Sequence, residues 1–198
     1  MISDIVKNLH ESLPNDPKWN KLTAHNNRWH RDPAFKDYHK LGNKQKGVLG
    51  EEYTERLMQS LGSAVKPPTH TDHDRIIDGY KTEIKFSLAV SDTKKDLIVC
   101  DKFIINHIAA SKDWDRLVFI GINPMPSWSN IKKKNNASSP RVRAYYMEKK
   151  DFIKHLQEGT SSVFKHQQSG QKAKNDDYIC AKFQNFIDLD FVREIKEW

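Results

Sequence analysis

The sequence predicts an α/β protein in which helices flank a mixed central sheet. The pair Asp78-Gly79 lies between two apolar runs, and both residues tolerate the positive φ angles that a two-residue hairpin turn needs. A helix predicted over residues 47–61 precedes this hairpin, and another predicted over 101–111 follows it. An unbroken apolar run within residues 115–124 then indicates a buried strand. Because a strand reached through a crossover helix pairs in parallel, the sheet is expected to mix both strand directions.

The N-terminal segment combines a helix with a basic arm. Apolar residues recur at helical spacing from residue 3 to residue 13, with Ser3 available as a cap and Pro14 closing the segment. Residues 18–40 then interleave basic, aromatic and amide side chains, including Arg28 and Arg31. Such a mixture either contacts the phosphates and base edges of nucleic acid or forms a polar arm whose aromatic residues attach it to the core.

The remaining elements follow from periodicity and from turn residues. Residues 47–61 carry an apolar side chain every three or four positions and end at Gly62, and residues 64–66 form a short strand before two prolines. After a basic loop, we expect a strand over residues 144–147, a helix over 149–158 and a strand over 178–183. The tail beyond residue 183 is rich in apolar residues, so it either completes the core or forms a dimer contact.

Composition and charge limit the class of protein. The 198 residues include 33 Lys and Arg against 26 Asp and Glu, and the net charge of +7 favours a polyanionic partner. The two cysteines are too few for a disulfide scaffold and wrongly spaced for a zinc site. Without a signal-like segment or an apolar run of roughly 20 residues, we expect a soluble cytoplasmic protein that does not enter the membrane. One domain, 1–198, is predicted, with an N-terminal arm (1–44), a core (45–123) and a C-terminal part (124–198).

The hairpin carries charges that point to a metal site. If Ile77 pairs with Tyr80, Asp74 lies opposite Glu83 with their Cβ atoms about 5 Å apart, and strand alternation places Lys85 on the same face. Carboxylates this close repel each other unless a cation lies between them, and hard oxygen ligands suit Mg²⁺. The alternative is a surface hairpin with solvated charges. The apolar residues around the charges favour the metal site, because opposed charges on core strands are otherwise unfavourable.

At these residues the sequence resembles the PD-(D/E)xK superfamily of restriction-endonuclease-like nucleases. In that superfamily the first Asp and the Glu of Glu-x-Lys hold Mg²⁺, and the Lys assists the water that attacks the phosphodiester. The resemblance implies these roles for Asp74, Glu83 and Lys85. His73 stands where the motif name has proline. The predicted order of elements over roughly residues 45–123 matches the αβββαβ core of the superfamily.

The resemblance also implies a third acidic residue. In many of these nucleases a helix that starts with Gly-x-x-Gly-Glu supplies another metal ligand, and Glu51 of Gly47-Val-Leu-Gly50-Glu51 fits that place. Glu52 is the competing residue, but it lies about 100° further round the helix. Both glutamates are otherwise explained as solvated first-turn residues that favour the helix dipole. Asp72 competes with Asp74, whose strand parity it shares.

The resemblance implies a Mg²⁺-dependent endonuclease that cuts double-stranded DNA, most like a type II restriction enzyme. Cutting both strands of a palindromic site needs two active sites, so a homodimer is expected. The alternatives are a repair or junction-resolving nuclease of the same superfamily, or a DNA-binding module with an inactive core. An HNH-type site at His25, His30 and Asp32 is disfavoured by its spacing. The expected DNA-contacting residues are Lys132, Lys133, Lys134, Arg141, Arg143, Arg28 and Arg31.

Overall fold

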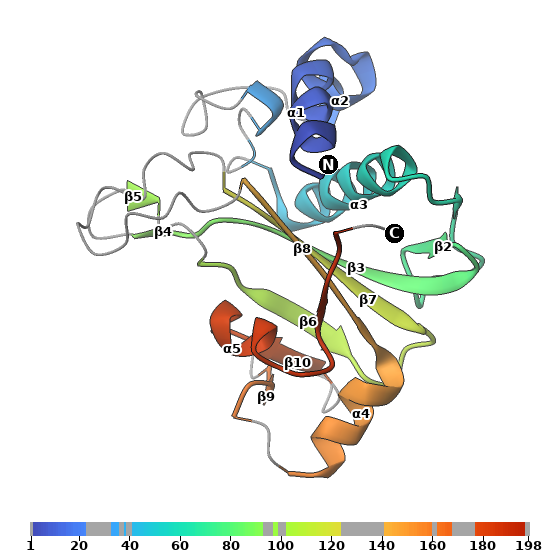
Figure 1. The fold of residues 1–198 in the computed structure, drawn as a ribbon, viewed down its shortest axis with the longest axis vertical. Coiled ribbons are helices and arrows are strands. Elements are labelled where there is room, and N and C mark those ends of the chain that lie inside the picture. Colours follow the sequence, from blue (N-terminus) through green and yellow to red (C-terminus); the bar gives the residue numbers. More distant parts are fainter. Residues whose placement is uncertain are drawn as a thin grey trace.

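The computed structural model describes residues 2–22, 33–35, 38, 41–92, 97–98, 102–123, 141–159, 162–167 and 177–196. Within these residues the centre is a six-stranded sheet with the strand order β1-β2-β3-β7-β8-β11 (Figure 1). Its strands are β1 (Val65–Lys66), β2 (Arg75–Ile77), β3 (Tyr80–Leu88), β7 (Arg116–Ile122), β8 (Val142–Glu148) and β11 (Arg193–Glu194). β3 and β7 run parallel, and the other neighbouring pairs of this sheet are antiparallel. The predicted mixed α/β class with a mixed central sheet is therefore confirmed.

The hairpin between β2 and β3 has the predicted register. Ile77 pairs with Tyr80, and the two turn residues Asp78 and Gly79 have φ angles of 50° and 88°. The Asp78 side chain also accepts a hydrogen bond from the Ala64 backbone N–H at 2.7 Å, which ties the turn to the segment before β1. The turn chemistry therefore fixes which residues of β2 and β3 face each other.

Helices lie on one side of this sheet. The helical elements there are α1 (Ile2–Ser12), η1 (Leu13–Asn15), α2 (Pro17–Leu22), η2 (Pro33–Phe35) and α3 (Asn43–Ser60). α3 lies across β3, and α1 and α2 pack on α3 away from the sheet (Figure 1). The predicted helices over residues 3–13 and 47–61 are thereby confirmed.

A glycine allows α3 to approach β3 closely. A Cβ atom on Gly50 would lie only 2.4 Å from the Cβ of Phe86, so any larger residue would push the helix away from the strand. The Phe86 ring stacks on Phe35 and also contacts Tyr53 of α3. The close approach of Gly50 to Phe86 sets the distance between the first turns of α3 and β3.

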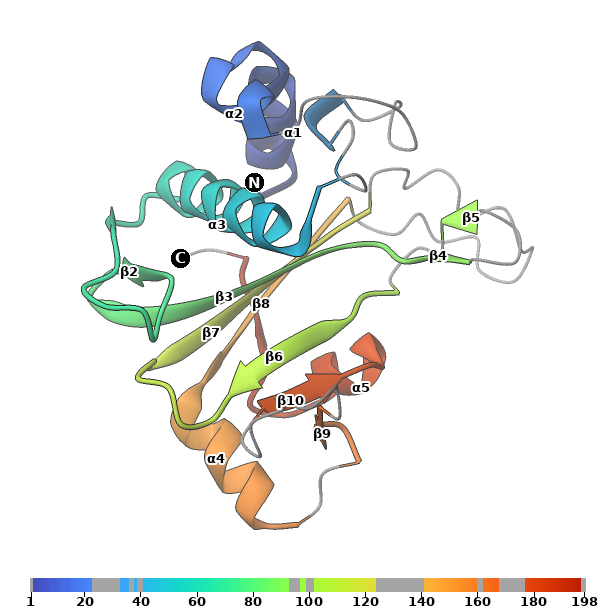
Figure 2. The same cartoon turned by 180° about the vertical axis from the view of Figure 1, so that it is seen from behind.

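The opposite side of the sheet corrects one prediction. The predicted helix over residues 101–111 is wrong, because in its described part, 102–111, β6 (Ile105–Ala109) pairs with β10 (Asp177–Cys180) in a second sheet with the order β6-β10-β9 (Figure 2). The β-branched isoleucines of this segment favour a strand once a partner strand is available. The crossover from β3 to β7 therefore contains a strand in place of the predicted helix, although the predicted parallel pairing is correct.

The C-terminal part joins the same core. The predicted strand and helix over residues 144–158 appear as β8 and α4 (Lys149–Gln157). β9 (Lys165–His166), β10 and α5 (Phe183–Ile187) follow, while β4 (Ser91–Asp92) and β5 (Leu97–Ile98) form a separate hairpin. Phe186, Val192 and Ile195 are buried in the core of their own chain, so the described part of the apolar tail completes that core. Among the described helices, none is both long and apolar enough to cross a bilayer.

Candidate active site

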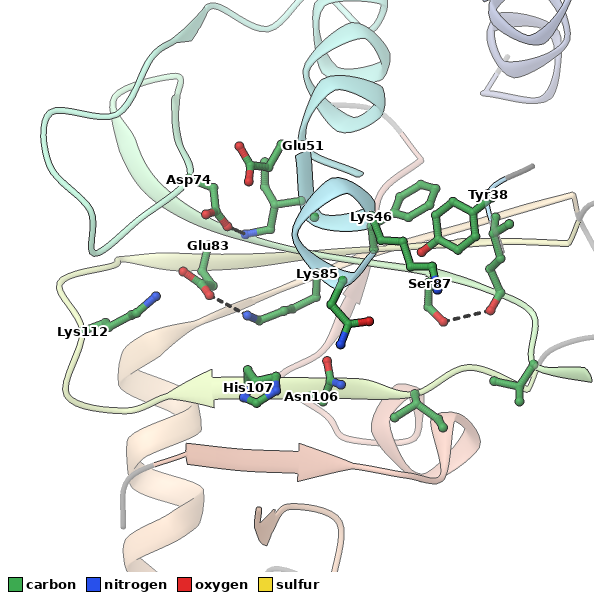
Figure 3. Close-up of a pocket in the computed structure, with 17 residues that line it drawn as sticks. Tyr38, Lys46, Glu51, Asp74, Glu83, Lys85, Ser87, Asn106, His107 and Lys112 are labelled. Carbon is green, nitrogen blue, oxygen red and sulfur yellow. Dashed lines mark hydrogen bonds and ion pairs between the residues drawn. The ribbon is translucent and has the colours of Figure 1, made fainter. Parts of the chain in front are cut away.

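Three segments bring the predicted residues together in one cleft. Glu51 lies on α3, Asp74 directly precedes β2, and Glu83 and Lys85 lie on β3. All four line a cleft of about 590 Å³ (Figure 3). Extending the register of β2 and β3 by one residue places Asp74 opposite Glu83, because Arg75 pairs with Thr82. The hairpin and the closely packed helix therefore build the cluster that the sequence predicts.

Glu83 and Lys85 form a buried ion pair at the base of this cleft. Lys85 Nζ lies 2.6 Å from Glu83 Oε1, and the two side chains are 15% and 3% exposed, respectively. The second oxygen of Glu83, Oε2, is buried and has no hydrogen-bond partner among the residues that the structure describes. Buried carboxylate oxygens are normally hydrogen-bonded, so this oxygen is available to accept a ligand.

Asp74 is fixed by the strand beside it. The backbone N–H of Ile84 donates a hydrogen bond of 2.7 Å to Asp74 Oδ2. The backbone N–H of Asp74 itself donates to the carbonyl of Thr82 at 3.0 Å. The carboxylate thus continues the hydrogen bonding of the β2–β3 ladder, and its position is determined by backbone atoms on both sides.

The electrostatics of the two carboxylates oppose their ionisation. Burial is the main cause that raises the pKa of Asp74, and the negative charge of Glu51 raises it further. Burial likewise raises the pKa of Glu83, and the charge of Asp74 adds to that effect against the attraction of Lys85. Both acids therefore hold their charge at an energetic cost, which a bound cation would remove.

Glu51, not Glu52, faces the cleft. Glu51 Oε2 accepts a hydrogen bond of 2.9 Å from Arg75 Nη1, and Arg75 also binds Glu55 at 2.8 Å. Glu52 points away from the cleft and pairs with Lys18 at 2.6 Å and with Arg56 at 2.9 Å. The buried Glu52 therefore connects α3 to α2, while Glu51 remains beside Asp74.

The donor set fits Mg²⁺ as a pair of carboxylates. Within the described ranges, no group of three or more His, Cys, Asp or Glu side chains is already arranged to hold a metal ion. Arg75 forms an ion pair with Glu51, and Lys85 forms one with Glu83. These ion pairs explain why the carboxylates are not already arranged around a metal ion. Mg²⁺ usually keeps several waters and is bound by one or two carboxylates together with substrate phosphates. Asp74 and the free oxygen of Glu83 meet that smaller requirement.

Three other predicted residues, Asp72, Arg141 and Arg143, do not join this cluster. Asp72 does not line the cleft, and its side chain is 49% exposed with His70 3.9 Å away. Arg141 and Arg143 are half-buried at the start of β8 and do not line the cleft either. The remaining predicted DNA-contacting residues, Lys132, Lys133, Lys134, Arg28 and Arg31, lie outside the described residues.

Several cleft residues were not predicted from the sequence. Lys112, from the connection between β6 and β7, points into the cleft toward Glu83 (Figure 3). Its positive charge partly opposes the rise in the pKa of both Asp74 and Glu83. Asn106 and His107 of β6 form the wall opposite α3, and Lys46 lies beside Tyr38 at the other end. These residues belong to no motif. The arrangement of β6 reveals Asn106, His107 and Lys112, whereas Lys46 lies in the first turn of α3.

Comparison of the chain with protein-family models, with curated proteins and with solved structures found no match.

Proposed function

We propose that this protein is a Mg²⁺-dependent endonuclease that hydrolyses phosphodiester bonds in double-stranded DNA, acting as a type II restriction enzyme. The observation that carries the proposal is a buried Glu83 oxygen that no described residue hydrogen-bonds, in a cleft shared with Asp74 and Lys85. Two acids with raised pKa values and a neighbouring lysine match the residue types of the PD-(D/E)xK motif. A perturbed cluster of this kind in a cleft is a recognised sign of an active site.

Each residue has a distinct chemical role in this proposal. Asp74 and Glu83 hold the metal ion, and Glu51 adds negative charge beside them from α3. When bound, Mg²⁺ lowers the pKa of a coordinated water and neutralises charge on the phosphate. Lys85 orients the attacking water and offsets the charge that develops on the phosphate oxygens. Lys112 supplies a second positive charge on the side of the cleft that faces Glu83.

The fold supports the same assignment at a coarser level. α3, the β2–β3 hairpin and the parallel neighbour β7 follow one another as in a restriction-endonuclease-like core, except that β6 replaces the expected crossover helix. The net charge of +7 favours binding to a polyanion. Two copies related by a twofold axis would present one cleft to each DNA strand, which is the basis for proposing a homodimer.

The proposal is tested by incubating the protein with plasmid DNA in the presence of Mg²⁺ and, separately, of EDTA. Discrete fragments that form only with Mg²⁺ support a restriction enzyme. Nicks or a smear indicate a repair-type nuclease, and cleavage of branched DNA alone indicates a junction-resolving enzyme. DNA that is bound but stays intact with Mg²⁺ refutes the nuclease and identifies a binding module.

The role of Lys85 is tested by Lys85→Ala with Lys81→Ala as the matched control. Both lysines lie on β3, but Lys81 pairs with Asp113 at 2.7 Å and does not line the cleft. Loss of a group that stabilises transition-state charge typically reduces the rate by about 10²- to 10³-fold. We expect that loss for Lys85→Ala with DNA binding retained, and wild-type cleavage for Lys81→Ala. Undiminished cleavage by Lys85→Ala would remove Lys85 from the mechanism.

A further inference from the structure

The wall of the cleft opposite α3 contains a β-bulge at Asn106 and His107. On β10, Tyr178 and Cys180 are two positions apart, but their partners on β6, Ile108 and Ile105, are three positions apart. β6 therefore carries one extra residue in this interval, which interrupts the alternation of its side chains. As a result Asn106 and His107 are both exposed, and both line the cleft (Figure 3).

His107 also has an unusual backbone conformation. Its φ angle is 53°, and among the described non-glycine residues only Asp78 shares a positive φ. The hairpin turn accounts for Asp78, and the bulge accounts for His107, because one residue of a bulge can take the left-handed conformation. A non-glycine residue held in this region is unfavourable, and such residues concentrate at functional sites.

Neighbouring residues orient the His107 ring. The backbone N–H of His107 donates to Gln167 Oε1 at 2.9 Å, so the amide nitrogen of Gln167, 3.2 Å from His107 Nε2, is the donor to the ring. Asp177 Oδ2 lies 3.8 Å from His107 Nδ1, beyond hydrogen-bond reach. The ring is thus fixed, 60% exposed, and placed beside a carboxylate.

We propose that Asn106 and His107 form a base-reading subsite that contributes to the sequence specificity of the nuclease, an inference that rests on the proposed function. The Asn106 amide offers a donor and an acceptor, the pair that recognises the edge of adenine. The exposed His107 ring offers a surface or an edge for a nucleobase. The carboxylate of Asp177 beside the ring would repel a phosphate, which favours a base over the DNA backbone as the partner.

The test compares Asn106→Ala and His107→Gly with His166→Ala, an exposed histidine on β9 that stacks on Tyr178 and does not line the cleft. Each protein is used to select binding sites from random duplex DNA with Ca²⁺ as a non-catalytic ion. We expect both cleft variants to lose preference at one or two base positions, by roughly 10- to 100-fold for Asn106→Ala. His166→Ala should select the wild-type sequence.

Thermal unfolding separates this role from a structural one. Glycine adopts a positive φ without strain, so His107→Gly should unfold at the wild-type temperature or above it while losing base preference. An unchanged selected sequence in both cleft variants overturns the subsite. A loss that is equal for all sequences identifies a backbone contact and also overturns base reading.

The selection is independent of cleavage. If the wild-type protein binds a defined sequence but does not cut it with Mg²⁺, the proposed nuclease activity fails while the subsite is still tested by the variants. If the wild-type protein cuts DNA and the variants keep its sequence preference, the subsite alone fails.

Discussion

Replacing Glu83 with glutamine is expected to stabilise the metal-free protein and to remove its response to Mg²⁺. The Glu83 side chain is only 3% exposed, and burial together with Asp74 raises its pKa despite the ion pair with Lys85 at 2.6 Å. At pH 8 the fold therefore bears an energetic cost for keeping this carboxylate charged. Glutamine has nearly the same shape, and its amide oxygen still accepts a hydrogen bond from Lys85. The substitution removes the charge without leaving a cavity.

The size of the effect follows from two conversions. Each pH unit by which folding raises a pKa corresponds to about 1.4 kcal/mol of stability. For a chain of 198 residues, 1 kcal/mol shifts the unfolding temperature by roughly 2–4 °C. Glu83→Gln should therefore unfold about 3–6 °C above the wild-type protein for each such unit. A ligand at 100 times its Kd adds about 2.7 kcal/mol, so Mg²⁺ should raise the unfolding temperature of the wild type by about 5–11 °C.

The assay is thermal unfolding followed by circular dichroism, with EDTA and with saturating Mg²⁺. The control is Glu148→Gln, because the hydrogen bond from Lys150 lowers the pKa of Glu148 and that residue does not line the cleft. Glu148→Gln should unfold no higher than the wild type and keep the response to Mg²⁺. If Glu83→Gln instead unfolds at a lower temperature and the wild type ignores Mg²⁺, the Glu83–Lys85 pair is a structural ion pair and the metal site is wrong.

Two further predictions concern packing and pH. Gly50→Ala should lower the free energy of unfolding in urea by about 1–3 kcal/mol, because the added Cβ would lie 2.4 Å from Phe86. The control is Gly47→Ala, where the added Cβ meets open space. It should stabilise α3 by up to about 1 kcal/mol. If both variants change the free energy of unfolding equally, the packing of α3 on β3 does not depend on the close contact at Gly50. Without metal, the wild type should lose stability relative to Glu83→Gln as pH rises above 4.5, the ordinary Glu value, until it passes the raised pKa of Glu83. In that range the folded state binds more protons than the unfolded state, and a difference curve that is flat or rises with pH contradicts the raised pKa.

The local parts of the fold and the site were predictable from the sequence. Asp78-Gly79 determines a turn, the turn determines the register, and the register places Asp74 opposite Glu83, so each step depends on neighbouring residues alone. Helix geometry allows only one of Glu51 and Glu52 to face the cleft, and the resemblance implies Glu51. The pairing of Glu52 with Lys18 agrees with that choice. That these residues bind metal and cut DNA stays a prediction.

The wrong prediction over residues 101–111 has a single physical origin. Whether Ile105 and Ile108 form part of a helix or of a strand depends on a partner, and that partner, β10, begins at Asp177. Spacing within the segment contains no information about so distant a pairing. The same pairing creates the bulge that exposes Asn106 and His107 together. The half of the cleft that faces α3 was therefore missed for the same reason as the strand.

This difference in origin divides the cleft into two structurally distinct halves. The half built by the hairpin and α3 carries the acids and Lys85, and its geometry is determined locally, so it tolerates little change in the intervening turn. The half built by β6 carries Asn106 and His107 on a strand held by Gln167 and β10. Substitutions there alter what the cleft contacts without moving Glu83 or Asp74. In the proposed nuclease this division would allow the recognised sequence to change while the chemistry stays the same, so we expect Asn106 and His107 to affect specificity and Lys85 to affect rate.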